Sequence, residues 1–454
     1  MKITELIADS KMSRFQILAI VVAIVLTVID GYDNAMMVFA APYVTKEFAS
    51  SASLIGVVMS GALIGMVVGS ILIAPIADKL GRRLIGIIGT IVVTIGMVIA
   101  PLAHSLPTLL AGRIVTGLGL GMLLSVVGVI AAEYSNRRVY PIVMSIYAAG
   151  INIGAVLGAV LVGPLLPEHG WRFGFWIGVV FSVIAILIAI AAFPESISWL
   201  AARRKPGSLD RLNRTLGRMG HEPLPLLPDD QLPPRDRRGA LRTVFSSKLV
   251  TQTLLLVLGN IALLVSFYFA NSWAPNTLAE TTRNPAIAAP TTLALGLGGI
   301  LGTVVFGFIS TKVSPRVLTP IFLIVGAVGI AIFGSIESHI GGALTEIFAA
   351  SFFFSSGVAG FYQIAPRLYP TLARATGYGI VTGAGRLGGI AAPILAGAAL
   401  DAHISVPMVF VIFALPLVVS ALCLVVLVAV ESVQRRRKPA SVAADEGPLA
   451  SLAN

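Results

Sequence analysis

The sequence is poor in the residues on which most catalytic and metal-binding sites depend. A single cysteine, Cys423, stands among 454 residues, which excludes an internal disulfide and a thiolate metal cluster. The five histidines are scattered without the spacing of metal ligands. Only 12% of the residues are charged, whereas a soluble domain contains about a quarter. The composition therefore argues against an enzyme, a resident metal or an organic cofactor.

Apolar residues make up the bulk of the chain. They account for 56% of it, and the mean hydropathy is +0.92. Continuous apolar runs of about 20 residues, the length of a bilayer-spanning helix, recur along almost the whole sequence. Barrel strands are shorter and alternate in polarity, so we predict an all-α polytopic membrane protein. The first run has no small-residue cleavage site and is expected to be retained. The twelve expected helices cover about residues 15–41, 51–73, 84–103, 106–132, 139–165, 172–193, 249–274, 286–310, 317–336, 341–366, 375–400 and 404–430.

The net charge of +11 is explained by membrane topology and does not indicate nucleic-acid binding. When every second loop is taken, one side of the expected bundle holds 27 of the 32 lysines and arginines. The opposite side holds only Lys46, Arg172 and Arg283. Because cytoplasmic loops carry the excess of basic residues, we predict cytoplasmic termini, an even number of helices and a place in the cell inner membrane.

A long polar stretch divides six expected helices from six. Within it, residues 208–219 place Leu209, Leu212 and Leu216 on one helical stripe, which suits either a helix at the cytoplasmic interface or a partly ordered linker. The expected units are an N-terminal six-helix bundle (1–193), a cytoplasmic linker (194–248), a C-terminal six-helix bundle (249–430) and a disordered cytoplasmic tail (431–454).

The two halves share a short loop at a constant offset of 233 residues. Lys79 matches Lys312, and Arg83 matches Arg316. A loop that recurs at corresponding positions is the trace of two transporter halves facing each other around a central site.

Two carboxylates interrupt the first apolar run. Asp30 and Asp33 each cost roughly 2.5–3.5 kcal/mol on insertion scales, and their i, i+3 spacing puts both on one helix face. From a rise of about 1.5 Å per residue, Arg113 of the fourth run lies at a comparable depth and Arg386 of the eleventh lies near the midplane. A site built from both halves would therefore contain two acids and two guanidinium groups.

Several motifs, in the right order, resemble those of the major facilitator superfamily. Asp78-Lys-Leu-Gly-Arg-Arg83 resembles its helix 2–3 signature, and residues 112–121, 170–172 and 194–196 fit its later motifs. Within the superfamily, Asp30-Gly-Tyr-Asp33 resembles the helix-1 motif of the aromatic acid:proton symporters. Further similarities to that family are Trp273 with Pro275, residues 369–377 and residues 383–388.

The sequence departs from the family pattern at three places. Ala74 stands where glycine is usual in the helix 2–3 signature, Thr311 replaces the acid of its second copy, and Arg367 precedes Tyr369-Pro370 where an acidic residue is expected. These departures bear on the gate and leave the expected fold unchanged.

The resemblance implies proton-coupled uptake of an aromatic carboxylate, such as a benzoate or hydroxybenzoate, by alternating access. Two like charges in a low-dielectric site favour protonation of one of them, so Asp30 and Asp33 are candidates to bind the proton, with Arg113 as counter-ion. Arg386 is a bidentate donor for the substrate carboxylate. The remaining candidate substrate-binding residues are Arg113, Tyr32, Tyr268, Trp273, Tyr362 and Asn152, and the candidate gating residues are Asp78, Arg82, Arg83, Glu133, Arg137 and Glu195. The expected partners are the small aromatic acid, the proton and the lipid bilayer, with the chain a monomer.

Other interpretations stay open at this point. Asp33 and Arg113 form either a functional pair or a structural pair that holds helices 1 and 4 together. Arg386 is alternatively a packing partner of a carbonyl, and the aromatic residues of helix 7 are alternatively core or lipid-facing. Pro194-Glu-Ser-Ile-Ser-Trp199 resembles the helix-6 end of sugar porters, although the end of helix 12 does not. Another organic acid or a sugar is the alternative substrate, and a transporter-like sensor is the alternative role.

Overall fold

The computed structural model describes residues 7, 9–202, 207–227, 237–247, 249–335, 340–369 and 373–436. Twelve helices within these residues are long and apolar enough to cross a membrane, which confirms the predicted all-α class and the number of spans. In chain order these helices are α2 (Arg14–Phe48), α3 (Ala52–Leu80), α4 (Arg82–Ile99), α5 (Leu106–Glu133), α6 (Tyr140–Leu161), α8 (Trp171–Ala192), α12 (Val250–Thr281), α13 (Ala288–Ile309), α14 (Pro315–Phe333), α15 (Ile340–Leu368), α16 (Arg374–Asp401) and α17 (Val406–Arg436).

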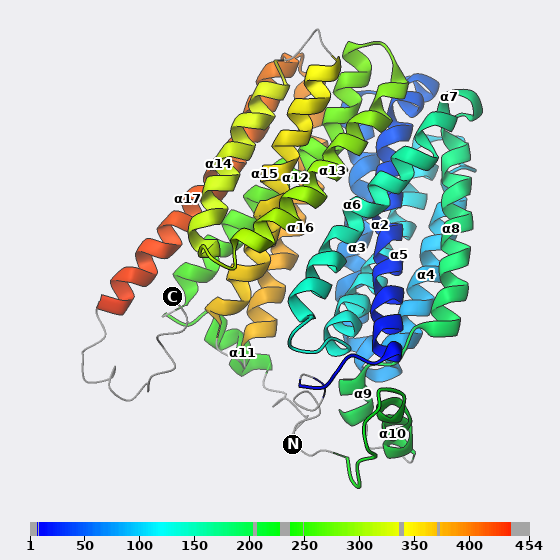
Figure 1. Cartoon of the computed structure of the whole chain (residues 1–454). Helices are drawn as coiled ribbons and strands as arrows, with labels where there is room; N and C mark the ends of the chain where they lie inside the picture. Colours follow the sequence, from blue (N-terminus) through cyan, green and yellow to red (C-terminus); the bar gives the residue numbers. More distant parts are fainter. Residues whose placement is uncertain are drawn as a thin grey trace.

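The helices form two bundles of six that repeat one arrangement (Figure 1). In the first bundle α5 packs on α3 and α4, and α2 packs on α6 and α8. In the second bundle α15 packs on α13 and α14, and α12 packs on α16 and α17. The tenth, eighth and ninth spans thus reproduce the fourth, second and third, as the 233-residue repeat predicts. One large cluster of buried apolar side chains fills the first bundle and extends to Ala279, Ala288 and Ala289 of the second, and another fills the rest of the second bundle.

The helix boundaries follow local sequence signals. Ser13 starts α2 with a capping box, because its hydroxyl accepts from the Gln16 N–H while the Gln16 side chain accepts from the Ser13 N–H. Ser51 and Ser105 cap α3 and α5 in a similar way. Many large apolar side chains are exposed along the spans, which is the surface expected against lipid tails.

Glycines allow α2 and α6 to approach closely. A Cβ at Gly31 would lie 1.8 Å from the Ile151 carbonyl oxygen, and one at Gly154 would lie 2.1 Å from the Val28 carbonyl oxygen. Gly150, one turn before Gly154, also faces α2. The glycines at four-residue spacing in α6 are therefore helix-packing residues, as small residues commonly are in membranes.

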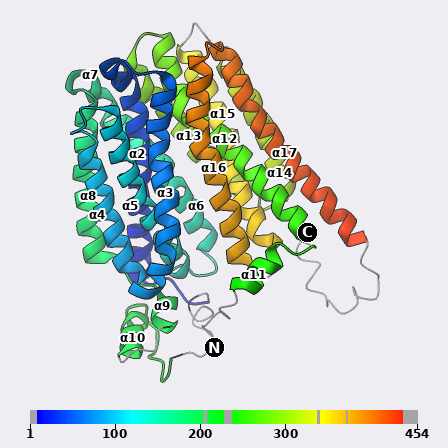
Figure 2. The same cartoon turned by 180° about the vertical axis from the view of Figure 1, so that it is seen from behind.

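The bundles meet along two seams on opposite faces of the molecule. At one seam α6 packs on α13, which Figure 1 shows in front; at the other α3 packs on α16, which Figure 2 shows in front. Gly56 and Gly397 make the second seam tight, because a Cβ on either would lie within 2.4 Å of a backbone carbonyl oxygen of the other bundle.

One end of the molecule is held shut across the α3–α16 seam, and we call it the closed end. Asp401, the last residue of α16, accepts hydrogen bonds from the backbone N–H groups of Ala52 and Ser53 at 2.9 Å each, at the start of α3. Farther along the same seam the Ser60 hydroxyl donates to the Ile390 carbonyl at 2.8 Å. This end therefore joins the bundles by helix capping as well as by close packing.

The bundles diverge toward the other end, which we call the linker end (Figures 1 and 2). Among the described side chains, the last hydrogen bond of the seam in this direction runs from Arg386 Nη1 to Ser70 Oγ at 3.2 Å. Beyond it, a Cβ at Gly383 or Gly379 would meet no atom within 4 Å. The wall of α16 thus faces open space on the linker side of Arg386.

The segment between the bundles carries three short helices, α9 (Ile197–Ala202), α10 (Ser208–Arg218) and α11 (Arg237–Val244). The predicted amphipathic helix is present as α10, which buries Leu212 and Leu216 and exposes Arg211. Its position at a membrane surface stays a prediction. The predicted tail begins within α17, which continues to Arg436, and its remainder, 437–454, lies outside the described residues.

Candidate functional site

Asp33 forms a buried ion pair that joins α2 to α5. Its Oδ1 accepts from Arg113 Nη1 at 2.6 Å, and the two side chains are only 1% and 2% exposed. The same Nη1 lies 3.3 Å from the Asp33 carbonyl oxygen. Within the part of the chain that the structure describes, Asp33 Oδ2 and Arg113 Nε have no hydrogen-bond partner, so one short contact holds the two side chains together. Removing either partner would leave an uncompensated buried charge.

Asp30 lies in a different environment one turn earlier. It is 6% exposed and makes no hydrogen bond or ion pair with any other residue that the structure describes. It lies within Coulombic range of Asp33, Arg386 and Arg113. The two acids of the motif therefore differ: Asp33 has a dedicated counter-ion, and Asp30 has none in contact.

Arg386 reaches this region from the second bundle. Of its five N–H donors, the described contacts use one, toward Ser70 Oγ at 3.2 Å. The guanidinium is partly exposed and lies within Coulombic range of Asp30. The planar guanidinium group of Arg386, with N–H groups that the described contacts do not use, is suited to bind a carboxylate through two parallel hydrogen bonds.

Tyrosines from both bundles lie near Asp30 and Arg386. Tyr147 of α6, Tyr268 of α12 and Tyr362 of α15 all lie within Coulombic range of both Asp30 and Arg386. The ring of Tyr378 in α16 meets that of Tyr362 edge to face, with centroids 6.0 Å apart. Aromatic rings so arranged can pack against a flat apolar ligand while their hydroxyl groups remain available to polar atoms.

Tyr147 and Tyr378 belong to the site although the sequence did not single them out. Neither belongs to a motif that the sequence singles out, and a tyrosine in a membrane-spanning helix is usually a packing or interface residue. Gly150 contacts α2, and Tyr147 lies one helical turn from Gly150 toward the linker end. Counting residues along α6 from Gly150 would have given this depth for Tyr147.

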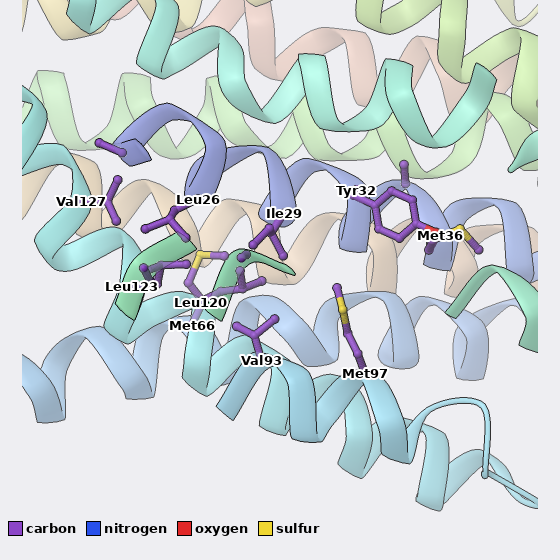
Figure 3. Close-up of a cluster of buried hydrophobic side chains, with 14 of the residues drawn as sticks. Leu26, Ile29, Tyr32, Met36, Met66, Val93, Met97, Leu120, Leu123 and Val127 are labelled. Atoms are coloured by element: carbon purple, nitrogen blue, oxygen red, sulfur yellow. The ribbon is translucent and has the colours of Figure 1, made fainter. Parts of the chain in front are cut away.

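Two predicted substrate-binding aromatics lie elsewhere. The Tyr32 hydroxyl donates to the Gly174 carbonyl at 2.7 Å inside the first bundle, and Figure 3 shows its ring among buried apolar side chains near Met36. Trp273 is buried and donates from Nε1 to the Pro393 carbonyl at 3.1 Å, which ties α12 to α16. Successive residues of a helix are rotated by about 100°, so the Tyr32 side chain points roughly 160° away from that of Asp30. This rotation explains why Tyr32 faces the interior of the first bundle while Asp30 faces the site.

Four of the predicted gating residues form one cluster at the linker end of the first bundle: Arg82, Arg83, Glu133 and Glu195. Glu133 at the end of α5 accepts from Arg82 Nη1 at 2.6 Å, and it also binds the Ile197 N–H at 2.9 Å and the hydroxyl groups of Ser196 and Ser198. The cluster thereby links the start of α4 and the end of α5 to the chain that follows α8.

Glu195 completes this cluster by capping α4. Its Oε1 accepts from the Arg82 and Arg83 N–H groups at 2.7 and 3.2 Å. Gly81, the residue before α4, has φ +104°, and a Cβ there would lie 2.5 Å from Glu195 Oε2. Glycine is therefore required at this turn for two reasons: the positive φ disfavours residues with a side chain, and Glu195 leaves no room for a Cβ.

The other two gating candidates are Arg137 and Asp78. Arg137 pairs with Asp9 at 3.4 Å, where both side chains are largely exposed. The side chain of Asp78 lies outside the described part of the chain. In the second bundle Arg316, the repeat partner of Arg83, forms an ion pair with Glu431 at 2.6 Å. The second copy of the loop therefore retains an ion pair although Thr311 replaces its acid.

Asn152 lies on the α6–α13 seam. A Cβ at Gly299 of α13 would be 3.2 Å from Asn152 Nδ2. The side chain is partly exposed and makes no hydrogen bond with another described residue. Asn152 is thus a polar side chain with no hydrogen-bond partner among the described residues, at the contact between two membrane-spanning helices.

Comparison with known proteins gives matches along most of the chain. A family model described as Major Facilitator Superfamily matches residues 23–345 and 256–452. A gallate transporter of Pseudomonas putida is 28% identical over 423 residues, which cover 92% of this chain and 93% of that protein. A 4-hydroxybenzoate transporter of Acinetobacter baylyi is 26% identical, with 93% of each chain covered.

A solved structure shares the fold. The xylose transporter of Escherichia coli, in a partially occluded inward-open conformation, superposes with a TM-score of 0.69 over 90% of this chain and 97% of that chain. The sequence identity is 18%, so the likeness concerns the fold alone.

Proposed function

Because this chain belongs to the Major Facilitator Superfamily, and is thus a membrane transporter and not an enzyme, we propose that it is a symporter of protons and a small aromatic carboxylate. It works by alternating access, in which the central site opens to one side of the membrane at a time. What we propose is the coupling of transport to protons, the aromatic substrate, and the residues that bind the proton and the substrate.

A single observation carries the proposal: the unequal pairing of the four charges. Asp33 and Arg113 neutralise each other at 2.6 Å, whereas Asp30 and Arg386 come from different bundles and have no ionic contact with any described residue. Asp30 is free to accept a proton, and Arg386 is free to accept an anion. Asp33 then serves as the fixed counter-ion of Arg113, and the proton is carried by Asp30.

The charge balance favours moving both together. With all four groups ionised the site carries two negative and two positive charges. A carboxylate bound at Arg386 adds one negative charge, and a proton on Asp30 removes one, so the loaded site stays neutral. An uncompensated charge in a low-dielectric interior costs several kcal/mol. The carrier therefore changes conformation more readily with both the proton and the carboxylate bound than with only one of them.

Two features support an aromatic substrate. Four tyrosines from α6, α12, α15 and α16 lie near the charged groups and offer flat apolar surfaces. Several relatives of this chain are named for aromatic acids, among them gallate and 4-hydroxybenzoate. An aliphatic acid would use Arg386 but would leave these rings without a partner.

The orientation follows from the basic residues. We propose that the linker end faces the cytoplasm of a cell with this protein in its inner membrane, because the loops on that side carry most lysines and arginines. The described conformation is then closed outside and open inside. The Glu133 cluster would stabilise the first bundle as a rigid unit while the bundles rock. We expect the monomer to be sufficient for transport.

Uptake into proteoliposomes tests the proposal. The purified full chain should concentrate labelled 4-hydroxybenzoate when the outside is acidic, and collapse of the gradient with an ionophore should abolish accumulation. Accumulation that persists without a gradient would refute symport. Concentration of a sugar in place of aromatic acids would refute the substrate assignment.

Two substitutions test the roles of the charges. Asp30→Asn should abolish gradient-driven accumulation and retain exchange of substrate across the membrane, because the proton step alone is lost. Arg386→Lys should raise the KM about 10-fold or more, since a point charge replaces a bidentate fork. The matched controls are Asp210→Asn and Arg211→Lys on exposed α10, which should behave as the unmodified protein. Uphill uptake by Asp30→Asn would remove Asp30 from the proton path.

A further inference from the structure

We infer that Asn152 and Ser355 form a subsite that hydrogen-bonds a polar substituent on the substrate ring, at the position far from the carboxylate. The inference rests on the proposed function, because it assumes that an aromatic carboxylate enters the site. It assigns a role in substrate selection to the α6–α13 seam, which lies on the face opposite the Arg386 seam.

Three polar side chains from the two bundles lie around Gly299 of α13. A Cβ at Gly299 would lie 2.9 Å from Ser355 Oγ, 3.2 Å from Asn152 Nδ2 and 3.4 Å from Ser351 Oγ. Asn152 belongs to the first bundle and the two serines to α15 of the second. Such convergence within an otherwise apolar seam is not needed for packing, which small apolar residues would satisfy.

The hydrogen bonds within this cluster are incomplete. Ser351 donates to the Leu295 carbonyl at 2.6 Å and lies 3.3 Å from Ser355 Oγ, so Ser351 is the anchored member. The Asn152 amide has two donors and one acceptor, and none of them is used by another described residue. A free amide within a membrane-spanning helix is costly unless a ligand or water binds it.

The depth of the cluster matches that of the charged groups. The residues that flank Asn152 contact α2 around Asp30: the Ile151 carbonyl abuts Gly31, and Gly154 abuts Val28. Arg386 is bound to Ser70 on the α3–α16 seam. A rigid acid whose carboxylate lies at Arg386 therefore extends its ring toward the opposite seam, where Asn152 and Ser355 meet its far substituent.

The chemistry of the cluster selects hydroxylated rings. An amide and a hydroxyl together donate to and accept from a phenol, whereas a ring without a substituent would leave both unpaired. Loss of one such neutral hydrogen bond corresponds to about a threefold to tenfold change in kcat/KM. The subsite thus predicts a preference for 4-hydroxybenzoate over benzoate.

The test compares uptake of these two acids by the full chain in proteoliposomes. Asn152→Ala and Ser355→Ala should each lower kcat/KM for 4-hydroxybenzoate about threefold to tenfold and leave that for benzoate within about twofold. The matched control is Ser356→Ala, because the Ser356 hydroxyl bonds the Phe352 carbonyl within α15.

The outcomes separate the two proposals. An unmodified protein that carries both acids equally, or variants that lower uptake of both acids by the same factor, would overturn the subsite and leave the proposed symport standing. A protein that carries no aromatic acid would overturn the proposed function and the subsite with it. A selective loss in the two variants with Ser356→Ala unaffected would establish the assignment.

Discussion

The contact between Asp401 and the start of α3 should set how often the closed end opens. Asp401 accepts two backbone N–H groups at 2.9 Å, an arrangement equivalent to a helix N-cap supplied by the other bundle. Loss of a cap costs about 0.5–2 kcal/mol, and because this carboxylate is exposed to solvent the lower part of that range, about 0.5–1 kcal/mol, applies. Since the contact exists only while this end is closed, Asp401→Ala should shift the equilibrium toward opening about twofold to fivefold.

Cysteine labelling measures that shift. Cys423, the single native cysteine, is buried, so a second cysteine gives a specific signal. Ser60 is fully buried in the seam below the contact, and a cysteine placed there should react with a membrane-impermeant maleimide only when this end opens. The labelling rate of Ser60→Cys should rise about twofold to fivefold when Asp401→Ala is added.

The control removes a carboxylate at the same end without touching the seam. Glu168 is exposed on α7 (Leu166–His169), and Glu168→Ala should leave the labelling rate unchanged. Equal rates with and without Asp401→Ala, or an equal rise with Glu168→Ala, would show that this contact does not hold the end shut.

Two further predictions concern stability. Asp33→Asn leaves Arg113 buried without its counter-ion and should destabilise the protein by about 3–5 kcal/mol, so its thermal midpoint in detergent should fall well below that of Asp30→Asn; equal midpoints would contradict the pairing. Gly81→Ala should lower the thermal midpoint by an amount that corresponds to about 1 kcal/mol or more, because a residue with φ +104° acquires a Cβ close to Glu195. The control is Gly217→Ala on exposed α10, where a Cβ would meet no atom within 4 Å, and this variant should not lower the midpoint.

The fold was predictable because lipid imposes it residue by residue. Every backbone group in a span must be bonded within its own helix, so run length and hydropathy alone define twelve helices. The 233-residue repeat indicated two equivalent bundles, and the helix contacts repeat accordingly. The charged residues were also predictable as a group, because a charge in a span is costly enough to stand out.

Helix rotation and contacts between distant segments were not predictable in the same way. In a helix apolar on all sides, composition does not distinguish the face toward the cavity from the face toward a neighbour. For that reason Tyr32 was expected at the site and lies inside the first bundle, while Tyr147 lies at the site and was not expected. The sequence also treated Asp30 and Asp33 alike, since only the position of Arg113 in space distinguishes them.

The pair between Asp33 and Arg113 has a consequence for biosynthesis. The two residues are 80 positions apart, so Asp33 leaves the ribosome before its partner exists. At about 5–20 residues per second, α2 waits roughly 4–16 s with an unpaired carboxylate at membrane depth. During that interval the first helix depends on its long apolar flanks, and it reaches its final position only when α5 arrives. Substitutions at Asp33 should therefore lower the yield of inserted protein during synthesis, and an insertase that retains early helices would be most needed at this step.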